Sequence, residues 1–257
     1  MNYLHAILLG IVEGITEFLP ISSTGHLILA AKVLKLPDSE FLKSFEIAIQ
    51  MGAILSVVVL YFRRVVGNMR LASKVLIAFV PTAVLGLLFY KIIKTYLLAS
   101  TNVVTVSLLL GGIFLIVFEY FHREKESAVD DLSAITVKQA VAIGLFQSIA
   151  MIPGVSRAAA TIVGGLLLGL KRKTIVEFSF LLAVPTMVAA TGLDLIKSSS
   201  EFNSSDFGLL AVGFVVSFLV ALITIKFLLN FIRNHTFTGF GVYRILVAIA
   251  FWILIRR

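Results

Sequence analysis

Apolar residues occur along this chain in long runs that short polar segments separate. Six runs have about the 20 residues that a helix needs to cross the hydrocarbon core of a bilayer. We therefore expect transmembrane spans at residues 43–62, 75–93, 103–121, 174–196, 207–231 and 239–255. This pattern predicts an all-α integral membrane protein with a single membrane domain over residues 1–257.

Two further apolar stretches, residues 3–36 and 138–170, are interrupted near their middle. Pro20 is followed by two serines, and Pro153 is followed by a glycine and a serine, all of which disrupt a straight helix. Each stretch is predicted to form a helix, a tight turn and a second short helix that leaves by the face it entered. Such re-entrant backbone is tolerated at membrane depth only inside protein or beside a wet cavity. Six spans and two hairpins give about ten helices.

The two halves of the chain have the same order of elements, a broken hairpin followed by three spans. Repeat one covers about residues 1–121 and repeat two about 138–257. Residues 10–13 align with 144–147, and after a gap of one residue, 20–23 align with 153–156. Because three spans are an odd number, the second half must be inserted upside down. Inverted repeats of this kind place binding sites near the midplane, where the halves meet.

Composition supports the membrane prediction and excludes other classes. The chain is 59% hydrophobic and 14% charged, with a mean hydropathy of +1.05, far from the values of soluble domains. The net charge of +8 comes from short basic clusters beside apolar runs, which is typical of membrane loops rather than of nucleic-acid binding. With no cysteine, disulfides and thiolate metal sites are excluded.

The basic residues also predict an orientation, because cytoplasmic loops carry the excess of lysine and arginine. Placing residues 63–74 in the cytoplasm puts twelve basic loop residues inside and eight outside. Both termini then face outward, the first hairpin enters from the outer face and the second from the cytoplasm. Four tyrosines fall at predicted span ends and are expected to anchor the interface: Tyr61, Tyr90, Tyr96 and Tyr120.

The first hairpin carries two acids that are costly to bury in a bilayer. Glu13 and Glu17 are four apart, so both project from one helix face and can converge on one ligand. The alternative is a surface amphipathic helix, for which the flanking apolar residues leave a poor polar face. After the break, hydroxyl residues can begin a new helix whose free N–H groups bind an anion. They are Ser22, Ser23 and Thr24, followed by Gly25 and His26.

His26 would lie in the first turn of that helix, where it could pass a proton or attack phosphorus. The second hairpin adds Arg157, whose planar fork of donors suits phosphate oxygens; the alternative is a structural partner for Glu13 or Glu17. Elsewhere, Glu46 and Gln50 share a helix face and are candidates for the cavity lining. We expect interfacial positions for the remaining acids and histidines: Glu119, Glu177, Asp194, His5, His122 and His235.

Residues 13–26 (EGITEFLPISSTGH) and 153–157 (PGVSR) strongly resemble the undecaprenyl-diphosphate phosphatases, also called bacitracin resistance proteins. The resemblance extends to residues 45–50, 177–185 and 243–244, and so covers nearly the whole chain. It implies a bacterial inner-membrane enzyme that hydrolyses undecaprenyl diphosphate to the monophosphate and inorganic phosphate. Such an enzyme recycles the lipid carrier of peptidoglycan and other envelope polymers, and its site opens to the outer face.

Carried over residue by residue, the resemblance implies catalytic roles for Glu17, Ser23, His26 and Arg157, without deciding between Ser23, His26 and water as the nucleophile. We expect substrate contacts from Glu13, Ser22, Thr24, Gly25, Gly154, Ser156 and Thr161. A divalent cation, Mg²⁺ or Ca²⁺, is expected at Glu13 and Glu17, with no organic cofactor. One departure is that Ala158 and Ala159 stand where the family usually has serine and glycine.

The expected partners are a polyprenyl diphosphate lipid and the bilayer, with no nucleic acid; a homodimer is left open. Two other classes compete with the phosphatase. A transporter or lipid flippase would share the inverted repeat, although converging hydroxyl, imidazole and guanidinium groups favour chemistry on an anion. A type-2 phosphatidic acid phosphatase would need a second histidine soon after the arginine, whereas the next one here is His235.

Overall fold

The computed structural model describes residues 1–92, 96–97, 100–197 and 207–255. In the described residues the chain forms ten α-helices, as predicted, and the expected all-α membrane fold is confirmed. The predicted boundaries lie within a few residues of the observed ones. The helices are α1 (Tyr3–Thr16), α2 (Ser23–Val33), α3 (Glu40–Val66), α4 (Met69–Ile92), α5 (Thr101–Phe121), α6 (Val137–Ser148), α7 (Arg157–Leu167), α8 (Arg172–Lys197), α9 (Phe207–Phe231) and α10 (Thr238–Ile255), with short 3₁₀ helices η2 (Leu132–Ala134) and η3 (Ile149–Met151).

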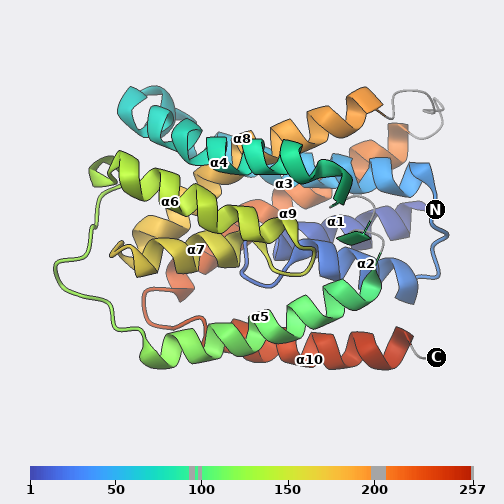
Figure 1. The fold of residues 1–257 in the computed structure, drawn as a ribbon. Helices are drawn as coiled ribbons and strands as arrows, with labels where there is room; N and C mark the ends of the chain where they lie inside the picture. The colour runs from blue at the N-terminus through green and yellow to red at the C-terminus, as the bar shows by residue number, and fades with distance from the viewer. Residues whose placement is uncertain (93–95, 98–99, 198–206, 256–257) are drawn as a thin grey trace.

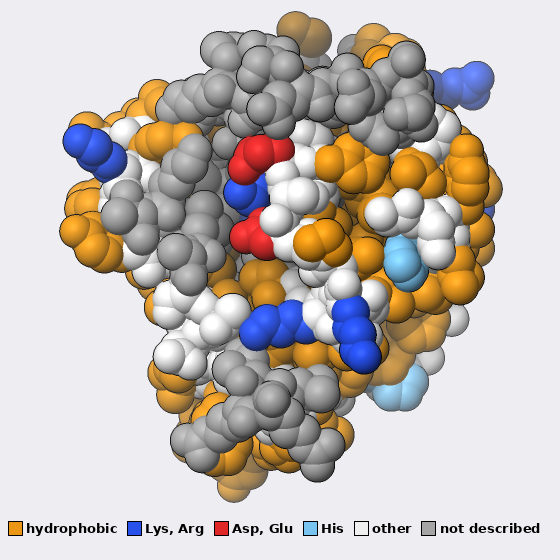
Figure 2. All heavy atoms as spheres, turned by 90° about the vertical axis from the view of Figure 1, so that its right-hand side faces the viewer, with side chains coloured by type: hydrophobic (Ala, Val, Ile, Leu, Met, Phe, Trp, Pro, Cys, Tyr) orange, Lys and Arg blue, Asp and Glu red, His pale blue; other side chains and the backbone are white. Residues whose placement is uncertain are grey.

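Five of the described helices, α3, α4, α5, α8 and α9, are long and apolar enough to cross a membrane. The chain is therefore a multi-pass membrane protein. The sixth predicted span corresponds to α10, which is shorter and lies against α5 for most of its length (Figure 1). The described N- and C-terminal residues lie at the same end of the bundle, which we call the terminal end. Figure 2 views this end, where few charged side chains lie among many hydrophobic ones.

The two hairpins, α1–α2 and α6–α7, enter the bundle from opposite ends, and their turns approach each other near its middle (Figure 1). Each hairpin packs on the middle span of the other half, α1 on α9 and α6 on α4. Glycines permit this close approach. A Cβ at Gly10 would come within 2.8 Å of the Gly213 carbonyl oxygen, and one at Gly144 would overlap the Ala78 carbonyl oxygen. The arrangement is that of an inverted repeat.

The structure corrects the alignment of the two hairpins. Helices α2 and α7 begin at residues 23 and 157, and each follows a serine with positive φ, Ser22 or Ser156. Glu13 and Gln147 stand nine residues before these serines, so the offset is 134 residues at both positions. The expected one-residue gap is therefore wrong. Ser22 corresponds to Ser156, and Ser23 corresponds to Arg157.

Several residues expected at the membrane interface are buried against neighbouring helices. Glu177 is paired with Arg64 at 2.6 Å, and Glu119 is paired with Arg172, both near the end opposite the termini. Tyr61 is also buried in the core. These acids join helices far apart in sequence, since an unpaired charge would be costly there. The side chain of Asp194 lies outside the described residues.

Candidate active site

The backbone of both hairpin turns is tightly specified before each second helix begins. Ser22 has φ 73° and Ser156 has φ 78°, a region that residues with a Cβ rarely adopt. Gly154 has φ 93°, and a Cβ there would lie 2.6 Å from the Val104 carbonyl oxygen. The second turn therefore lies directly against α5. This packing presents the N-termini of α2 and α7 to the space between the hairpins.

A chain of polar side chains crosses from one hairpin to the other. Ser23 donates from Oγ to Glu17 Oε2 at 2.6 Å, and Arg157 donates from Nη2 to Glu17 Oε1 at 3.0 Å. All three side chains are largely withdrawn from solvent. Glu17 therefore contacts a hydroxyl from its own repeat and a guanidinium from the other. The two hairpins therefore converge, as the sequence predicts. The ion pair between Glu17 and Arg157, which the sequence left as an alternative, is also present.

Arg157 is oriented by a second set of contacts on α8. Its Nη1 donates to the Ser179 carbonyl oxygen at 2.9 Å and to Ser179 Oγ at 3.2 Å. Thr161 Oγ1 lies 2.6 Å from the same serine hydroxyl and donates to the Arg157 carbonyl oxygen at 2.9 Å. The guanidinium also lies over the ring of Phe18, 5.9 Å from its centroid. Arg157 is thus held in one orientation, while its Nε has no partner among the described residues.

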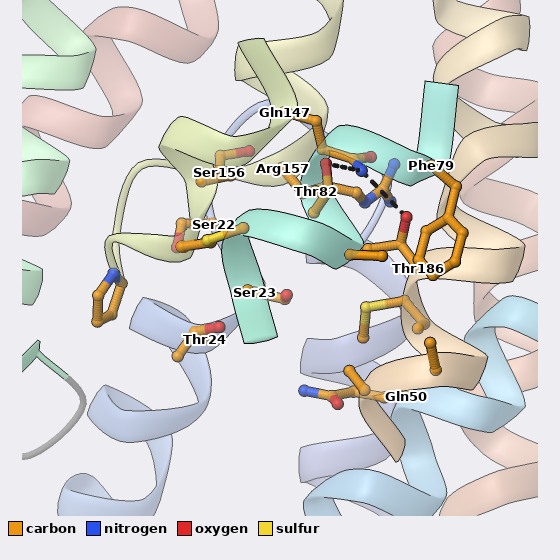
Figure 3. Close-up of a pocket in the computed structure, with 18 of the residues that line it drawn as sticks. Ser22, Ser23, Thr24, Gln50, Phe79, Thr82, Gln147, Ser156, Arg157 and Thr186 are labelled. Atoms are coloured by element: carbon orange, nitrogen blue, oxygen red, sulfur yellow. Dashed lines mark hydrogen bonds between the residues drawn. The ribbon is translucent and has the colours of Figure 1, made fainter. Parts of the chain in front are cut away.

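A cavity of about 530 Å³ opens beside this chain of polar groups. Its polar floor comes from the two hairpin turns, and Figure 3 shows Ser22, Ser23 and Thr24 on one side and Ser156, Arg157 and Gln147 on the other. Its walls come from α4 and α8 and are mostly apolar. They include Phe79, Ala83, Gly86, Leu87, Met187, Ala189 and Ala190.

Most of the predicted site residues lie in the lining of this cavity. They are Glu17, Ser22, Ser23, Thr24, Gly154, Ser156 and Arg157, together with Gln50 from α3. Four predicted residues lie outside the lining: Glu13, Gly25, His26 and Thr161. Gly25 faces α5, where a Cβ would lie 3.1 Å from Leu108 Cδ1. Glu46, the other expected lining residue of α3, is also absent from it.

His26 is buried on the side of α2 that faces α10. Its Nδ1 lies 2.7 Å from the Ser22 carbonyl oxygen, and its Nε2 lies 2.9 Å from the Tyr243 hydroxyl. Because a carbonyl oxygen can only accept, Nδ1 carries a proton. The rings of His26 and Tyr243 also stack, with planes 4° apart. Both ring nitrogens are therefore engaged in holding the first turn against α10.

Glu13 is fully buried, one helical turn before Glu17. Neither of its carboxyl oxygens has a hydrogen-bond partner among the described residues. An isolated carboxylate at this depth is costly. A carboxyl without a protein partner is therefore suited to bind a ligand from outside the chain. The described residues contain no group of three or more acidic or histidine side chains that could enclose a metal ion.

Sequence reasoning missed a cluster of neutral polar side chains where the second hairpin meets α4 and α8. Gln147 donates from Nε2 to the hydroxyls of Thr82 and Thr186, at 2.9 and 3.1 Å, and all three line the cavity (Figure 3). Its Oε1 is buried without a partner in the described part of the chain. The alignment contained the signal, because Gln147 is the counterpart of Glu13. The sequence carried no comparable signal for the two threonines, because they lie in apolar spans.

The fold and the site define a multi-pass membrane protein with a cavity between two hairpin turns that is lined by a guanidinium, a carboxylate and several hydroxyl groups. The family model described as bacitracin resistance protein BacA matches residues 6–250, so the chain belongs to that family. It is 52% identical to an undecaprenyl-diphosphatase of Aquifex aeolicus, over 98% of each chain. It is also 52% identical to the undecaprenyl-diphosphatase of Sulfurihydrogenibium sp., over 98% of this chain and 99% of the relative. A third relative of that name, from Wolinella succinogenes, is 50% identical over 98% of this chain and 97% of its own.

Proposed function

We propose that the chain hydrolyses undecaprenyl diphosphate at the junction of its hairpins, releasing undecaprenyl phosphate and inorganic phosphate. The observation that carries this proposal is the Ser23–Glu17–Arg157 chain of contacts, which brings a candidate nucleophile, a candidate base and a guanidinium together in one cavity with mostly apolar walls. Relatives with the printed name undecaprenyl-diphosphatase support the same substrate. The activity would recycle the lipid carrier and give resistance to bacitracin.

The short contact between Ser23 and Glu17 favours Ser23 as the nucleophile over His26. Ser23 Oγ would attack the terminal phosphorus, and its proton would pass to Glu17. The bond between that phosphorus and the bridging oxygen then breaks, and undecaprenyl phosphate leaves as the bridging oxygen takes the proton from Glu17. The regenerated Glu17 carboxylate would deprotonate water, which attacks the phosphoserine. The bond between phosphorus and Ser23 Oγ then breaks, the proton passes from Glu17 to Ser23 Oγ, and inorganic phosphate is released. Arg157 and the free N–H groups at the start of α2 would stabilise the charge that develops on the phosphoryl oxygens.

A divalent cation held in part by Glu13 would accompany the diphosphate. Mg²⁺ is commonly held by one or two carboxylates together with substrate phosphates rather than by an all-protein cage. The orphaned Glu13 carboxyl would supply one such ligand, with Glu17 as the second candidate. When bound, the cation would neutralise phosphate charge. No organic cofactor is required by this chemistry.

The apolar cavity walls account for a prenyl substrate. From the hairpin turns the lining continues along α4 from Phe79 to Tyr90, towards the terminal end of the bundle. Gly86 widens this path, because a Cβ there would meet only the end of Met151, at 3.5 Å. The first isoprene units would lie along this wall and the rest of the tail in the bilayer.

The proposed location is the bacterial inner membrane, with the terminal end and the cavity on the outer side. Because the chain has no cysteine, single cysteines report the orientation cleanly. Asp38→Cys near the terminal end should react with a membrane-impermeant maleimide in intact cells, and Lys125→Cys should react only after lysis. The opposite pattern would reverse the orientation.

The enzymatic proposal is tested by phosphate release from the purified protein in detergent, where a transporter has no compartments to connect. Undecaprenyl diphosphate labelled in its terminal phosphate should yield labelled phosphate, and an acid quench should trap label on the wild-type protein. Ser23→Ala should lower turnover by at least about 10³-fold and abolish trapping. Ser148→Ala, which removes a half-buried hydroxyl that donates to the Gly144 carbonyl oxygen, is the matched control and should stay within about threefold of wild type. No phosphate release from the wild-type protein would exclude the enzyme.

A further inference from the structure

Arg244 is a fully buried arginine on α10, a helix that contributes nothing to the cavity lining. Burying a guanidinium among apolar spans is costly unless its donors are satisfied. No acidic side chain lies within ion-pair distance of Arg244 in the described part of the chain. The charge must therefore be stabilised by something other than a carboxylate.

Main-chain carbonyl oxygens take that role, and they come from three separate segments. Nη1 donates to Val155 at 2.9 Å and to Pro20 at 3.3 Å. Nη2 donates to Gly154 at 2.8 Å and to Ser107 at 3.0 Å, and Nε donates to Leu108 at 3.4 Å. Arginine has five N–H donors in a rigid planar fork. All five are used, and the acceptors belong to both hairpin turns and to α5.

The neighbouring protein surface is shaped around this guanidinium. A Cβ at Gly111 on α5 would overlap Arg244 Nη2, so only glycine leaves room for it. Beside it on α10, Tyr243 reaches the first turn through His26, which in turn contacts the Ser22 carbonyl oxygen. Arg244 thus holds the first turn at Pro20, and Tyr243 holds it at Ser22 through His26. Arg244 also holds the second turn.

The held residues stand just before the candidate catalytic groups. Pro20 precedes Ser23 by three residues, and Val155 precedes Arg157 by two. A displacement of either turn would therefore change the separation between the Ser23–Glu17 pair and Arg157. Misplacement of reacting groups by about 1 Å can cost about 10²-fold in rate. We propose that Arg244 is a positioning residue that fixes the two hairpin turns to each other and so sets the geometry of the phosphoryl-transfer site.

This inference rests on the proposed hydrolysis, and its test uses the full-length protein in detergent with undecaprenyl diphosphate. Arg244→Gln removes the charge and most of the donors, and we expect kcat to fall by about 10²-fold with KM changed by less than about threefold. Arg244→Lys keeps the charge without the fork and should recover about tenfold of that loss. Tyr243→Phe removes only the hydroxyl that contacts His26 and should lower kcat by about three- to tenfold.

The matched control is Arg172→Gln, a half-buried arginine that pairs with Glu119 away from the cavity. It should lower the unfolding temperature but leave kcat within about threefold of wild type. Hydrogen exchange adds a local measurement: Arg244→Gln should speed exchange in peptides covering residues 17–23 and 152–157, whereas Arg172→Gln should not.

Wild-type kcat in a folded Arg244→Gln would overturn the positioning role. If Arg244→Gln does not fold, the same conclusion follows from Arg244→Lys and Tyr243→Phe with wild-type kcat and unchanged exchange in both turns. An inactive wild-type protein would instead refute the proposed hydrolysis itself, so the two failures are distinguishable.

Discussion

The two hairpins share one backbone design but carry different side chains. Each has a helix, a turn that ends in a serine at positive φ, and a second helix of eleven residues. At equivalent positions, however, the first has Glu13 and Ser23 where the second has Gln147 and Arg157. The repeat therefore supplies two helix N-termini facing one cavity, while divergence supplies an acid and a hydroxyl on one side and a cation on the other. Phosphoryl transfer needs both the paired helix N-termini and the different side chains.

The strongest test of this difference between the hairpins is the removal of the guanidinium from the second one. Arg157→Gln should lower kcat/KM by about 10³-fold, because it removes a preorganised donor to the developing charge and leaves Glu17 without its partner. Arg157→Lys should restore about tenfold, since charge remains but the fork is lost. Phosphate release measures both variants. Arg64→Gln, which breaks the ion pair with Glu177 away from the cavity, should stay within about threefold; equal losses in Arg64→Gln and Arg157→Gln would contradict the assignment.

The next test makes the first hairpin resemble the second. Glu13→Gln should lower turnover by about 10²-fold and raise the Mg²⁺ concentration for half-maximal activity by about tenfold or more, because the orphaned carboxyl is our candidate cation ligand. A Mg²⁺ titration at saturating substrate measures the shift.

The reciprocal change, Gln147→Glu, separates a cation ligand from a general effect of charge. It places a carboxylate near the diphosphate and should raise KM by about tenfold through like-charge repulsion, with an unchanged Mg²⁺ requirement. A Mg²⁺ requirement that is unchanged in Glu13→Gln would remove Glu13 from the cation site.

A smaller effect is expected where each hairpin packs on the opposite half. Gly144→Ala and Gly10→Ala both push a Cβ against a carbonyl oxygen, and the contact at Gly144 is the closer one. Overpacking typically costs about 1–3 kcal/mol, so both variants should unfold at lower temperature, with Gly144→Ala the less stable. Gly239→Ala is the control, because nothing lies within 4 Å of the added Cβ. Thermal unfolding in detergent ranks the three; if Gly10→Ala were the least stable, the packing of the hairpins would differ from the one described.

Hydropathy predicted the fold well because the bilayer imposes length and composition on each span. The predicted span of residues 207–231 coincides with α9, and both broken stretches are hairpins. The same argument did not predict the ion pairs of Glu119 and Glu177, because proximity to a span end does not reveal whether another helix supplies an arginine. Pairings across more than fifty residues depend on tertiary packing.

The candidate site was predictable where chemistry lies in the broken segments and not where it lies in regular spans. Ser23, Glu17 and Arg157 belong to the breaks and converge as expected. Arg244 sits in an ordinary apolar helix, and its carbonyl partners leave no mark on a sequence. His26 was expected at the phosphate, but the direction of its ring depends on Tyr243, 217 residues away.

The smallest predicted effect concerns the two serines that begin the second helices. A residue with a Cβ at positive φ costs about 1–2 kcal/mol, and glycine removes that strain at an entropic cost of about 0.5–1 kcal/mol. Ser22→Gly should therefore be neutral or more stable by up to about 1 kcal/mol, because the Ser22 side chain makes no capping bond.

Ser156→Gly should gain less from the same relief of strain. The Ser156 hydroxyl accepts the Ala159 N–H at 3.2 Å, and losing this cap costs a few tenths of a kcal/mol, about what glycine at an N-cap position gives up. Unfolding temperatures of the two variants, measured side by side, should therefore differ in favour of Ser22→Gly. A more stable Ser156→Gly would mean that the two turns are not equivalent in backbone strain. The two hairpins would then share the arrangement of their helices but not the backbone of their turns.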